Sequence, residues 1–236
     1  MRRRRRLWAL AVAAAIAAAA LAGFSLGEHR RAPSEAGLPV IRPAPNYVLT
    51  DQLGRQVSSA SLLGKVQIVT FLDPYCTNVC PLIAAHLVNF ENLAARPAGI
   101  AGKVAIIAFN LDPKNAGPAQ MRAFLEEYGW NPDDLHWQYL TGSPASLRHI
   151  VRDGFGVAYE GTPRSSAGGE GGPRVVEPEV VNKLAEEAHR GYDIAHSDVI
   201  EIVDRRGRVR KIFTDADTVG AFDLLKVVQA LLRGAS

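Results

Sequence analysis

Two continuous apolar runs stand out in the pattern of hydrophobic and polar positions along the chain. They are residues 66–72 (VQIVTFL) and 104–110 (VAIIAFN), and both are of strand length and rich in β-branched side chains. Uninterrupted runs of this kind are typical of strands that are covered on both faces of a sheet. We therefore predict two fully buried strands.

Between and after these runs, apolar residues recur at a period near 3.6 residues, which predicts helices. Start and stop signals support two of them. Pro118 lies at the start of one helix, and another has Ser143 as its N-cap, Pro144 at its first position and Gly154 just past its end. The predicted helices cover residues 80–95, 118–128, 144–153, 178–191 and 218–233.

Turn residues between short apolar stretches predict two hairpins. The first covers residues 46–65 and has its turn at 51–54. The second joins the stretches 199–204 and 208–214 through a turn at 205–207 that contains glycine.

Two further stretches complete the predicted fold. Residues 135–142 indicate a short strand and turn, and the Gly-rich residues 161–173 indicate a flexible surface loop without phosphate-loop spacing. The order of elements predicts an α/β sandwich with a mixed central sheet and helices on both faces. One hairpin extends it at the N-terminus and the other lies at one edge.

Residues 7–26 form a stretch of twenty positions without a charged side chain. Twenty helical residues span about 30 Å, which is the thickness of a bilayer's hydrocarbon core. Five arginines (Arg2–Arg6) precede the stretch and two follow it, so we expect the N-terminus inside and the body outside the cytoplasmic membrane.

The segment 1–26 is either an uncleaved anchor or a cleaved signal peptide. Small residues at Ala18, Ala20 and Ala22 suit a signal peptidase, but the apolar run exceeds the usual length of about 7–15 residues. We favour the anchor. Residues 27–45, rich in Pro, Gly and charge, are then a tether, and residues 46–236 are the folded body.

The composition is that of a globular protein, with 47% hydrophobic and 22% charged residues. The net charge of +3 comes from the N-terminus. Residues 1–31 hold seven arginines and one glutamate, which leaves 20 of the 27 basic and 23 of the 24 acidic residues for the body. A mildly acidic body argues against a nucleic-acid partner.

The chain has two cysteines, Cys76 and Cys80. They follow a buried strand, where ligand sites collect in α/β sheets, and Cys80 opens a helix whose dipole is expected to lower the thiol pKa. At this spacing the sulfur atoms can share a metal ion or close a disulfide. A purely structural disulfide is the less favoured interpretation, because so short a loop gains little from a cross-link.

A metal site needs a third ligand, and six histidines are candidates. His196 precedes a β-branched stretch and is expected in a turn at the rim of the sheet, although a turn histidine with an ordinary hydrogen bond is the simpler interpretation of this residue taken alone. The others are expected in the tether (His29), on another side of the cysteine helix (His86), on exposed helix surfaces (His149, His189) or at an ambiguous position (His136).

At these residues the chain resembles the SCO/SenC family of membrane-tethered, thioredoxin-like copper proteins that assist assembly of cytochrome c oxidase. The resemblance covers about residues 45–233, and its discriminating features are Cys-x-x-x-Cys-Pro (Cys76 to Pro81) and a distant His-Ser (His196, Ser197). Weaker features are an LTDQ-x-GR hairpin, Asp112–Pro113, an LTG turn with a later FGV, and Tyr192 ahead of the His-Ser.

The resemblance implies that Cys76, Cys80 and His196 bind copper, as Cu(I), Cu(II) or both. Thiolates suit Cu(I), which agrees with this set. The chain departs from the family pattern at Thr77, where proline is usual, and at Asn115 and Ala116, where Arg and Asp are usual. The second departure leaves open what Asp112 does, and residues 161–173 resemble an insertion.

The favoured hypothesis is a monomeric copper metallochaperone that delivers the ion to an oxidase subunit. The second hypothesis is a thiol–disulfide oxidoreductase that keeps a partner's cysteines reduced, with Cys76 and Cys80 as its redox pair. A peroxidase, suggested by a likeness to peroxiredoxins, is disfavoured. Those enzymes usually have Thr where this chain has Asp73, and a carboxylate beside a thiolate raises its pKa.

Overall fold

The computed structural model describes residues 38–131, 133–134, 136–163, 192–196 and 198–234. The chain divides into two units, Met1–Gly37 and Leu38–Ser236, and all of these residues belong to the second. The predicted membrane span 7–26, the predicted helix 178–191 and the Gly-rich loop from residue 164 onward lie outside the described residues.

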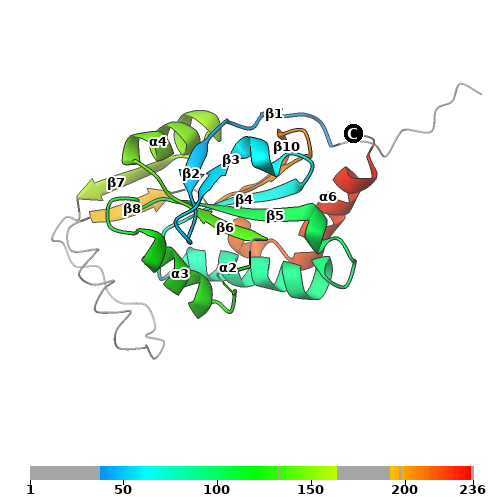
Figure 1. Ribbon diagram of the computed structural model, residues 1–236, viewed down its shortest axis with the longest axis horizontal. Helices are drawn as coiled ribbons and strands as arrows, with labels where there is room; N and C mark the ends of the chain where they lie inside the picture. The colour runs from blue at the N-terminus through cyan, green and yellow to red at the C-terminus, as the bar shows by residue number, and fades with distance from the viewer. Residues whose placement is uncertain (1–37, 132, 135, 164–191, 197, 235–236) are drawn as a thin grey trace, which may run out of the picture. The chain divides into compact units, whose positions relative to one another are not determined.

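A six-stranded mixed sheet forms the centre of the second unit (Figure 1). Its strand order is β1-β10-β9-β4-β5-β6. The strands β4 (Val66–Leu72), β5 (Val104–Asn110) and β6 (Trp137–Leu140) run parallel, and β9 (Ile200–Val203) runs antiparallel to β4. Every residue of β4 and β5 is buried, which confirms the prediction from the two apolar runs.

Both predicted hairpins are present. β10 (Arg208–Phe213) pairs with β9, and the two-residue strand β1 (Arg42–Pro43) pairs with the outer edge of β10. β2 (Val48–Thr50) and β3 (Gln56–Ser58) form the N-terminal hairpin, which lies on one face of the sheet.

Helices cover both faces of the sheet, as predicted (Figure 1). Side chains of α2 (Val79–Asn89), α3 (Pro118–Glu127) and α6 (Ala221–Arg233) pack on one face. The opposite face is covered by the β2–β3 hairpin and by α4 (Pro144–Arg148) with the π-helical turn that continues it, His149–Gly154. Because β4 and β5 lie between these two layers, their side chains are buried in both directions.

The helix starts follow their sequence signals. Ser143 caps α4, since its side chain accepts a hydrogen bond from the Ser146 N–H, and a proline occupies the first turn. α2 continues through a π-helical turn, Phe90–Ala95, so that the two together span the predicted helix 80–95 almost residue for residue.

Four local predictions are wrong. Gly161–Pro163 belong to the strand β7 (Tyr159–Pro163) rather than to a loop, and His196 ends the strand β8 (Tyr192–His196), which pairs with β7, rather than lying in a turn. Neither β7 nor β8 shows a clear alternating pattern of apolar and polar residues. Each is a strand because it pairs with the other, which is distant in the sequence, and not because of its local propensity. The last helix begins at Ala221 because Ala216–Thr218 form a 3₁₀ turn. β1 lies inside the predicted tether 27–45 and was also missed.

Candidate functional site

The two cysteines lie at the connection between the end of β4 and the start of α2. The chain leaves β4 after Leu72, makes a turn at Asp73 and enters α2 at Val79, so that Cys76 lies in the turn and Cys80 in the first turn of the helix. Cys76 is half-buried and Cys80 is fully buried. Neither forms a disulfide, and their side chains are hydrogen-bonded to each other. The expected closeness of the two sulfur atoms is therefore confirmed.

Asp73 holds the turn in place. Its Oδ1 accepts a hydrogen bond from the Tyr75 N–H at 2.9 Å, and its carbonyl accepts one from the Cys76 N–H at 3.1 Å. This is an Asx turn, in which the carboxylate replaces a backbone acceptor. The turn fixes the position of the first cysteine directly at the end of the buried strand.

The expectation of a lowered pKa for Cys80 is wrong. The hydrogen bond with Cys76 and burial of the side chain raise the pKa of the Cys80 thiol well above its usual value. The charge of Asp73 adds to the increase, and a hydrogen bond from the Asp73 backbone opposes it. Burial and the neighbouring sulfur outweigh the helix N-terminus here and favour the protonated form of the Cys80 thiol.

Two tyrosines from other elements lie near the sulfur pair. Tyr139 of β6 is fully buried and donates a hydrogen bond from its hydroxyl to the Leu72 carbonyl at 2.9 Å. Burial raises the pKa of Tyr139, with charge at Cys80 and Asp73 adding to the increase. Burial likewise raises the pKa of Tyr128, which follows α3, to about 12, and Glu127 and the cysteines add to it. These phenols are neutral walls of the site.

The loop after β5 is tied to the cysteine turn. Asp112 is buried, and the Asn115 side-chain amide donates to both of its carboxylate oxygens, at 3.1 and 2.9 Å. The Tyr75 hydroxyl donates to the Asn115 carbonyl at 3.1 Å. Asp112 thus organises this loop, and Asn115, which departs from the family pattern, is the residue that binds it. Burial raises the pKa of Tyr75, with the charges of Asp112 and Asp73 adding to the increase.

The backbone leads His196 to the same edge of the sheet as the cysteines. His196 ends β8, and four residues later Ile200 pairs with Thr70 of β4. The Thr70 hydroxyl also donates to the Val199 carbonyl at 3.3 Å. Two residues after Thr70, β4 ends and the cysteine turn begins. The His196 side chain itself lies outside what the structure describes.

The other described histidines are not near the sulfur pair in any metal-binding arrangement. His86 Nε2 lies 2.7 Å from the Asp217 carbonyl, and His149 is exposed and lies 2.9 Å from Asp153, as expected for a surface residue. His136 lies 3.7 Å from the buried Glu91. Within the described residues no group of three or more His, Cys, Asp or Glu could hold a metal ion. His29 and His189 lie outside those residues.

Sequence reasoning missed the tyrosines of the site. Tyr75 stands directly before Cys76, and this adjacency was a signal that could have been used. Tyr128 and Tyr139 carry no comparable signal, because only the packing of α3 and β6 in the folded unit brings them near the sulfur pair.

A dithiol between the end of a central β-strand and the start of a helix, in a mixed sheet with helices on both faces, defines a thioredoxin-like protein. The family model for SCO1/SenC matches residues 41–232. The chain therefore belongs to the SCO1/SenC family, which confirms the resemblance found in the sequence.

A curated relative, the SCO1 protein homolog of Bacillus subtilis, is 33% identical over 97 residues, or 41% of this chain. The match spans about half of that relative (47%). Among solved structures, a SCO1/SenC family lipoprotein from Bacillus anthracis has a TM-score of 0.63 at 19% identity and covers 84% of this chain and 100% of its own.

Arabidopsis thaliana ScoI with copper bound has a TM-score of 0.59 at 19% identity, covering 80% of this chain and 98% of its own. BsSco, described with a disulfide switch as a Sco protein of cytochrome c oxidase assembly, has a TM-score of 0.60 at 22% identity, covering 84% and 98%. At these identities the likeness shows the fold, and the predicted thioredoxin-like architecture is confirmed.

Proposed function

We propose that the protein is a copper metallochaperone, which carries copper on Cys76, Cys80 and His196 and passes it to a copper centre of a respiratory oxidase. The observation that carries the proposal is the pair of thiols, Cys76 and Cys80, hydrogen-bonded to each other at the end of β4. Family membership and the copper-bound Sco structures support the choice of metal.

The donor set suits copper as cargo. Two thiolates and one imidazole make a soft, trigonal set of the kind that Cu(I) prefers. Binding requires both thiols to lose their protons, so the ion must compensate for the burial that keeps Cys80 protonated. Cys76 is the more exposed sulfur, and an incoming thiolate from an acceptor protein meets it first.

The test is the copper content of the reduced full-length chain, measured together with its sulfur-to-copper charge-transfer absorbance. We expect one copper per chain in the wild type and a loss of affinity of at least about tenfold in His196→Ala and Cys76→Ser. His149→Ala, a change at an exposed histidine, is the matched control and should bind as the wild type does. Equal affinity in His196→Ala would rule out the proposed site.

A thiol–disulfide oxidoreductase is the second candidate, and the contact between the two thiols favours it. The Cys76 thiolate would attack a partner's disulfide and form a mixed disulfide. Cys80 would then displace the partner's thiol, so that two electrons and two protons pass to the partner and Cys76–Cys80 become oxidised. Reduction of a model disulfide at equal rates in the wild type and His196→Ala would favour this function over copper transport.

We also propose that residues 7–26 anchor the protein in the cytoplasmic membrane with the folded unit on the outer side. The charge pattern supports this arrangement. Among the residues that the structure describes, no helix is long and apolar enough to span a bilayer. Membrane fractionation with external protease tests the proposal: the full-length chain should sediment with membranes and its folded unit should be accessible. Release of a shortened chain would instead indicate a cleaved signal.

A further inference from the structure

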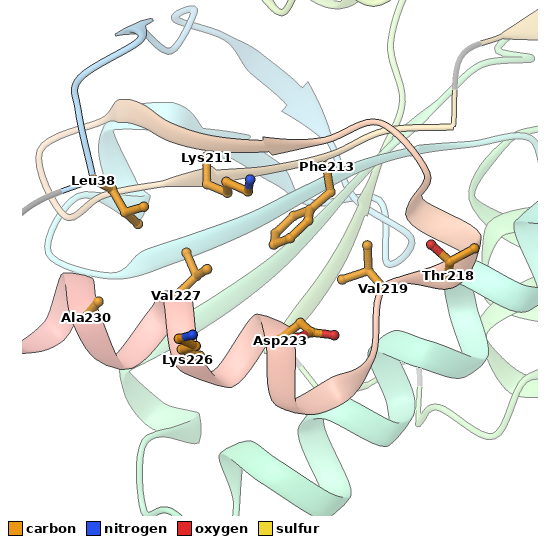
Figure 2. Close-up of a pocket in the computed structure, with 9 residues that line it drawn as sticks. All are labelled: Leu38, Lys211, Phe213, Thr218, Val219, Asp223, Lys226, Val227 and Ala230. Atoms are coloured by element: carbon orange, nitrogen blue, oxygen red, sulfur yellow. The ribbon is translucent and has the colours of Figure 1, made fainter.

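A cavity of about 490 Å³ lies between β10 and α6, away from the cysteines (Figure 2). Lys211 and Phe213 reach into it from the strand, and residues at the start of and along α6 form the opposite wall. Its volume is in the range of small-molecule sites, about 300–1,000 Å³. We call it the β10–α6 groove.

The groove combines apolar walls with two cations. Phe213, Val219 and Val227 supply apolar surface, and Lys211 and Lys226 bring one ammonium group from each wall. Lys211 Nζ lies 5.0 Å from the centre of the Phe213 ring. Neither lysine forms an ion pair with another residue of the described ranges, although the Asp223 carboxylate also lines the groove. Such a site suits a ligand with an anionic group and an apolar body.

The groove lies at the point where the chain enters the folded unit. Leu38, the first described residue, is one of its lining residues. Eleven residues, 27–37, connect it to the apolar stretch 7–26, and fully extended they reach about 40 Å at most. If that stretch is the anchor proposed above, chain continuity alone keeps the groove within this distance of the bilayer surface.

Exposed apolar residues adjoin lining residues of the groove along the chain. Phe222 precedes the lining residue Asp223, lies one helical turn from Lys226, and has 69% of its surface exposed. Val40 and Ile41, close to Leu38 in the chain, are also about half exposed. Exposed aromatic and aliphatic side chains next to lysines are typical of protein surfaces that contact the headgroup layer of a membrane.

We propose that the β10–α6 groove binds an anionic phospholipid of the adjacent membrane, with its phosphate between Lys211 and Lys226 and an acyl chain against Phe213, Val219 and Val227. The supply of lipid rests on the proposed anchor, whereas the binding chemistry rests on the groove alone. Binding would hold the folded unit in a fixed orientation at the membrane surface.

The experiment offers photoactivatable phosphatidylglycerol or phosphatidylcholine, each with the same acyl-chain diazirine, to the full-length chain in nonionic detergent micelles. Micelles deliver the lipid whether or not residues 7–26 are an anchor. We expect phosphatidylglycerol to cross-link to β10 and α6 at least about fivefold more than phosphatidylcholine, as mapped by peptide mass spectrometry. In Lys211→Ala/Lys226→Ala the preference should disappear.

Two further variants separate the groove from general surface charge. Lys103→Ala/Lys114→Ala removes two exposed lysines elsewhere and should keep the full preference. Ala230→Trp fills the groove but leaves both lysines, and should lower cross-linking of both lipids; thermal unfolding checks that each variant is folded. Copper binding, measured on the same samples, should be unchanged, so that failure of this proposal and failure of the copper site are distinguishable.

Equal cross-linking of the two lipids by the wild type would overturn the proposal, as would cross-links confined to residues 7–26 or a preference that survives in Lys211→Ala/Lys226→Ala. A dimer that dissociates in that double variant would assign the groove to a second copy of the chain instead, and would overturn it as well.

Discussion

The turn that carries Cys76 and the turn between β9 and β10 follow the same scheme. In both, an aspartate Oδ1 accepts a hydrogen bond from the backbone N–H two residues later, at 2.9 Å for Asp73 and 3.0 Å for Asp204. In both, the aspartate carbonyl accepts a hydrogen bond from the N–H of the third residue after the aspartate, which is Cys76 in one turn and Gly207 in the other. The β2–β3 turn, led by Asp51, repeats the second version.

The third residue after the aspartate determines the direction in which the chain leaves the turn. Gly207 has a φ of 76°, in the left-handed region, and turns the chain back into an antiparallel strand. Cys76 has no positive φ, so the chain continues forward into α2. The fourth residue differs too: Arg208 Nε donates to the Asp204 carboxylate at 2.9 Å, whereas Thr77 offers no cation at this position. One turn therefore closes a hairpin, and the other presents a thiol beside a carboxylate.

The largest expected effect is at the structural turn. Asp204→Ala removes the acceptor of the Arg206 and Arg208 N–H groups and the carboxylate that binds Arg208 and Arg210. Because Asp204 is buried, we expect the free energy of unfolding to fall by about 3 kcal/mol. Urea denaturation measures the loss. Asp133→Ala, which breaks an exposed ion pair with Arg122, is the control and should cost less than about 1 kcal/mol.

Asp204 also makes the free energy of unfolding depend on pH, with a smaller effect than that of the Asp204→Ala substitution. Burial alone would raise the pKa of Asp204, but the hydrogen bonds from Arg208 and Arg210 outweigh it and hold the pKa below the usual value. Its ionised form therefore stabilises the fold. This contribution is fully present above the unfolded pKa, about 4, and is lost as the pH falls through the lower pKa of the folded state. Unfolding followed from pH 6 to pH 2 should show a steeper loss in the wild type than in Asp204→Asn; parallel curves would contradict the prediction.

These turns also show which parts of the fold can be predicted from the sequence. Asp-x-x-Gly-Arg occurs at residues 51–55 and 204–208, and both places were predicted as hairpin turns. The strands β4 and β5 were predictable because their burial on both faces leaves a continuous apolar run. Where the structure depends on distant partners, the sequence is less informative: β7 and β8 pair across the residues between them, and their sequences carry no strand pattern.

The cysteine site was predictable in its place but not in its electrostatics. Spacing and position located Cys76 and Cys80 at the end of a strand. The direction of the Cys80 pKa depends on complete burial and on the hydrogen bond between the sulfur atoms, and neither follows from the local sequence. The hydrogen bond from the Tyr139 hydroxyl to the Leu72 carbonyl and the one from the Asn115 amide to the Asp112 carboxylate also depend on how separate segments pack.

A further prediction compares Gly207 with Cys76, the residues three positions after the aspartate in the two turns. Gly207→Ala places a Cβ on a left-handed residue and should cost about 1 kcal/mol or slightly more, with the closest contact to Leu63 at 3.4 Å. Cys76→Ala, at the equivalent position without a positive φ, should cost less than this. Urea denaturation of the two variants side by side measures the difference. An equal or larger loss in Cys76→Ala would contradict the prediction and would show that the packing of the Cys76 thiol and its hydrogen bond with Cys80 stabilise the fold more than the left-handed Gly207 does.

The smallest expected effect is at the carboxylate beside the thiols. Asp73→Asn keeps a side-chain oxygen that can accept the Tyr75 hydrogen bond, so the turn should persist with a loss of stability below about 1 kcal/mol. It removes a charge that raises the pKa of Cys80, so this thiol should ionise at a lower pH. We expect the ultraviolet absorbance of the thiolates to rise at a lower pH in Asp73→Asn than in the wild type when the folded protein is titrated. Asp133→Asn, a change to an exposed carboxylate outside the turn, should titrate as the wild type does. A rise at a higher pH in Asp73→Asn would mean that Asp73 acts on the thiols through the shape of the turn and not through its charge.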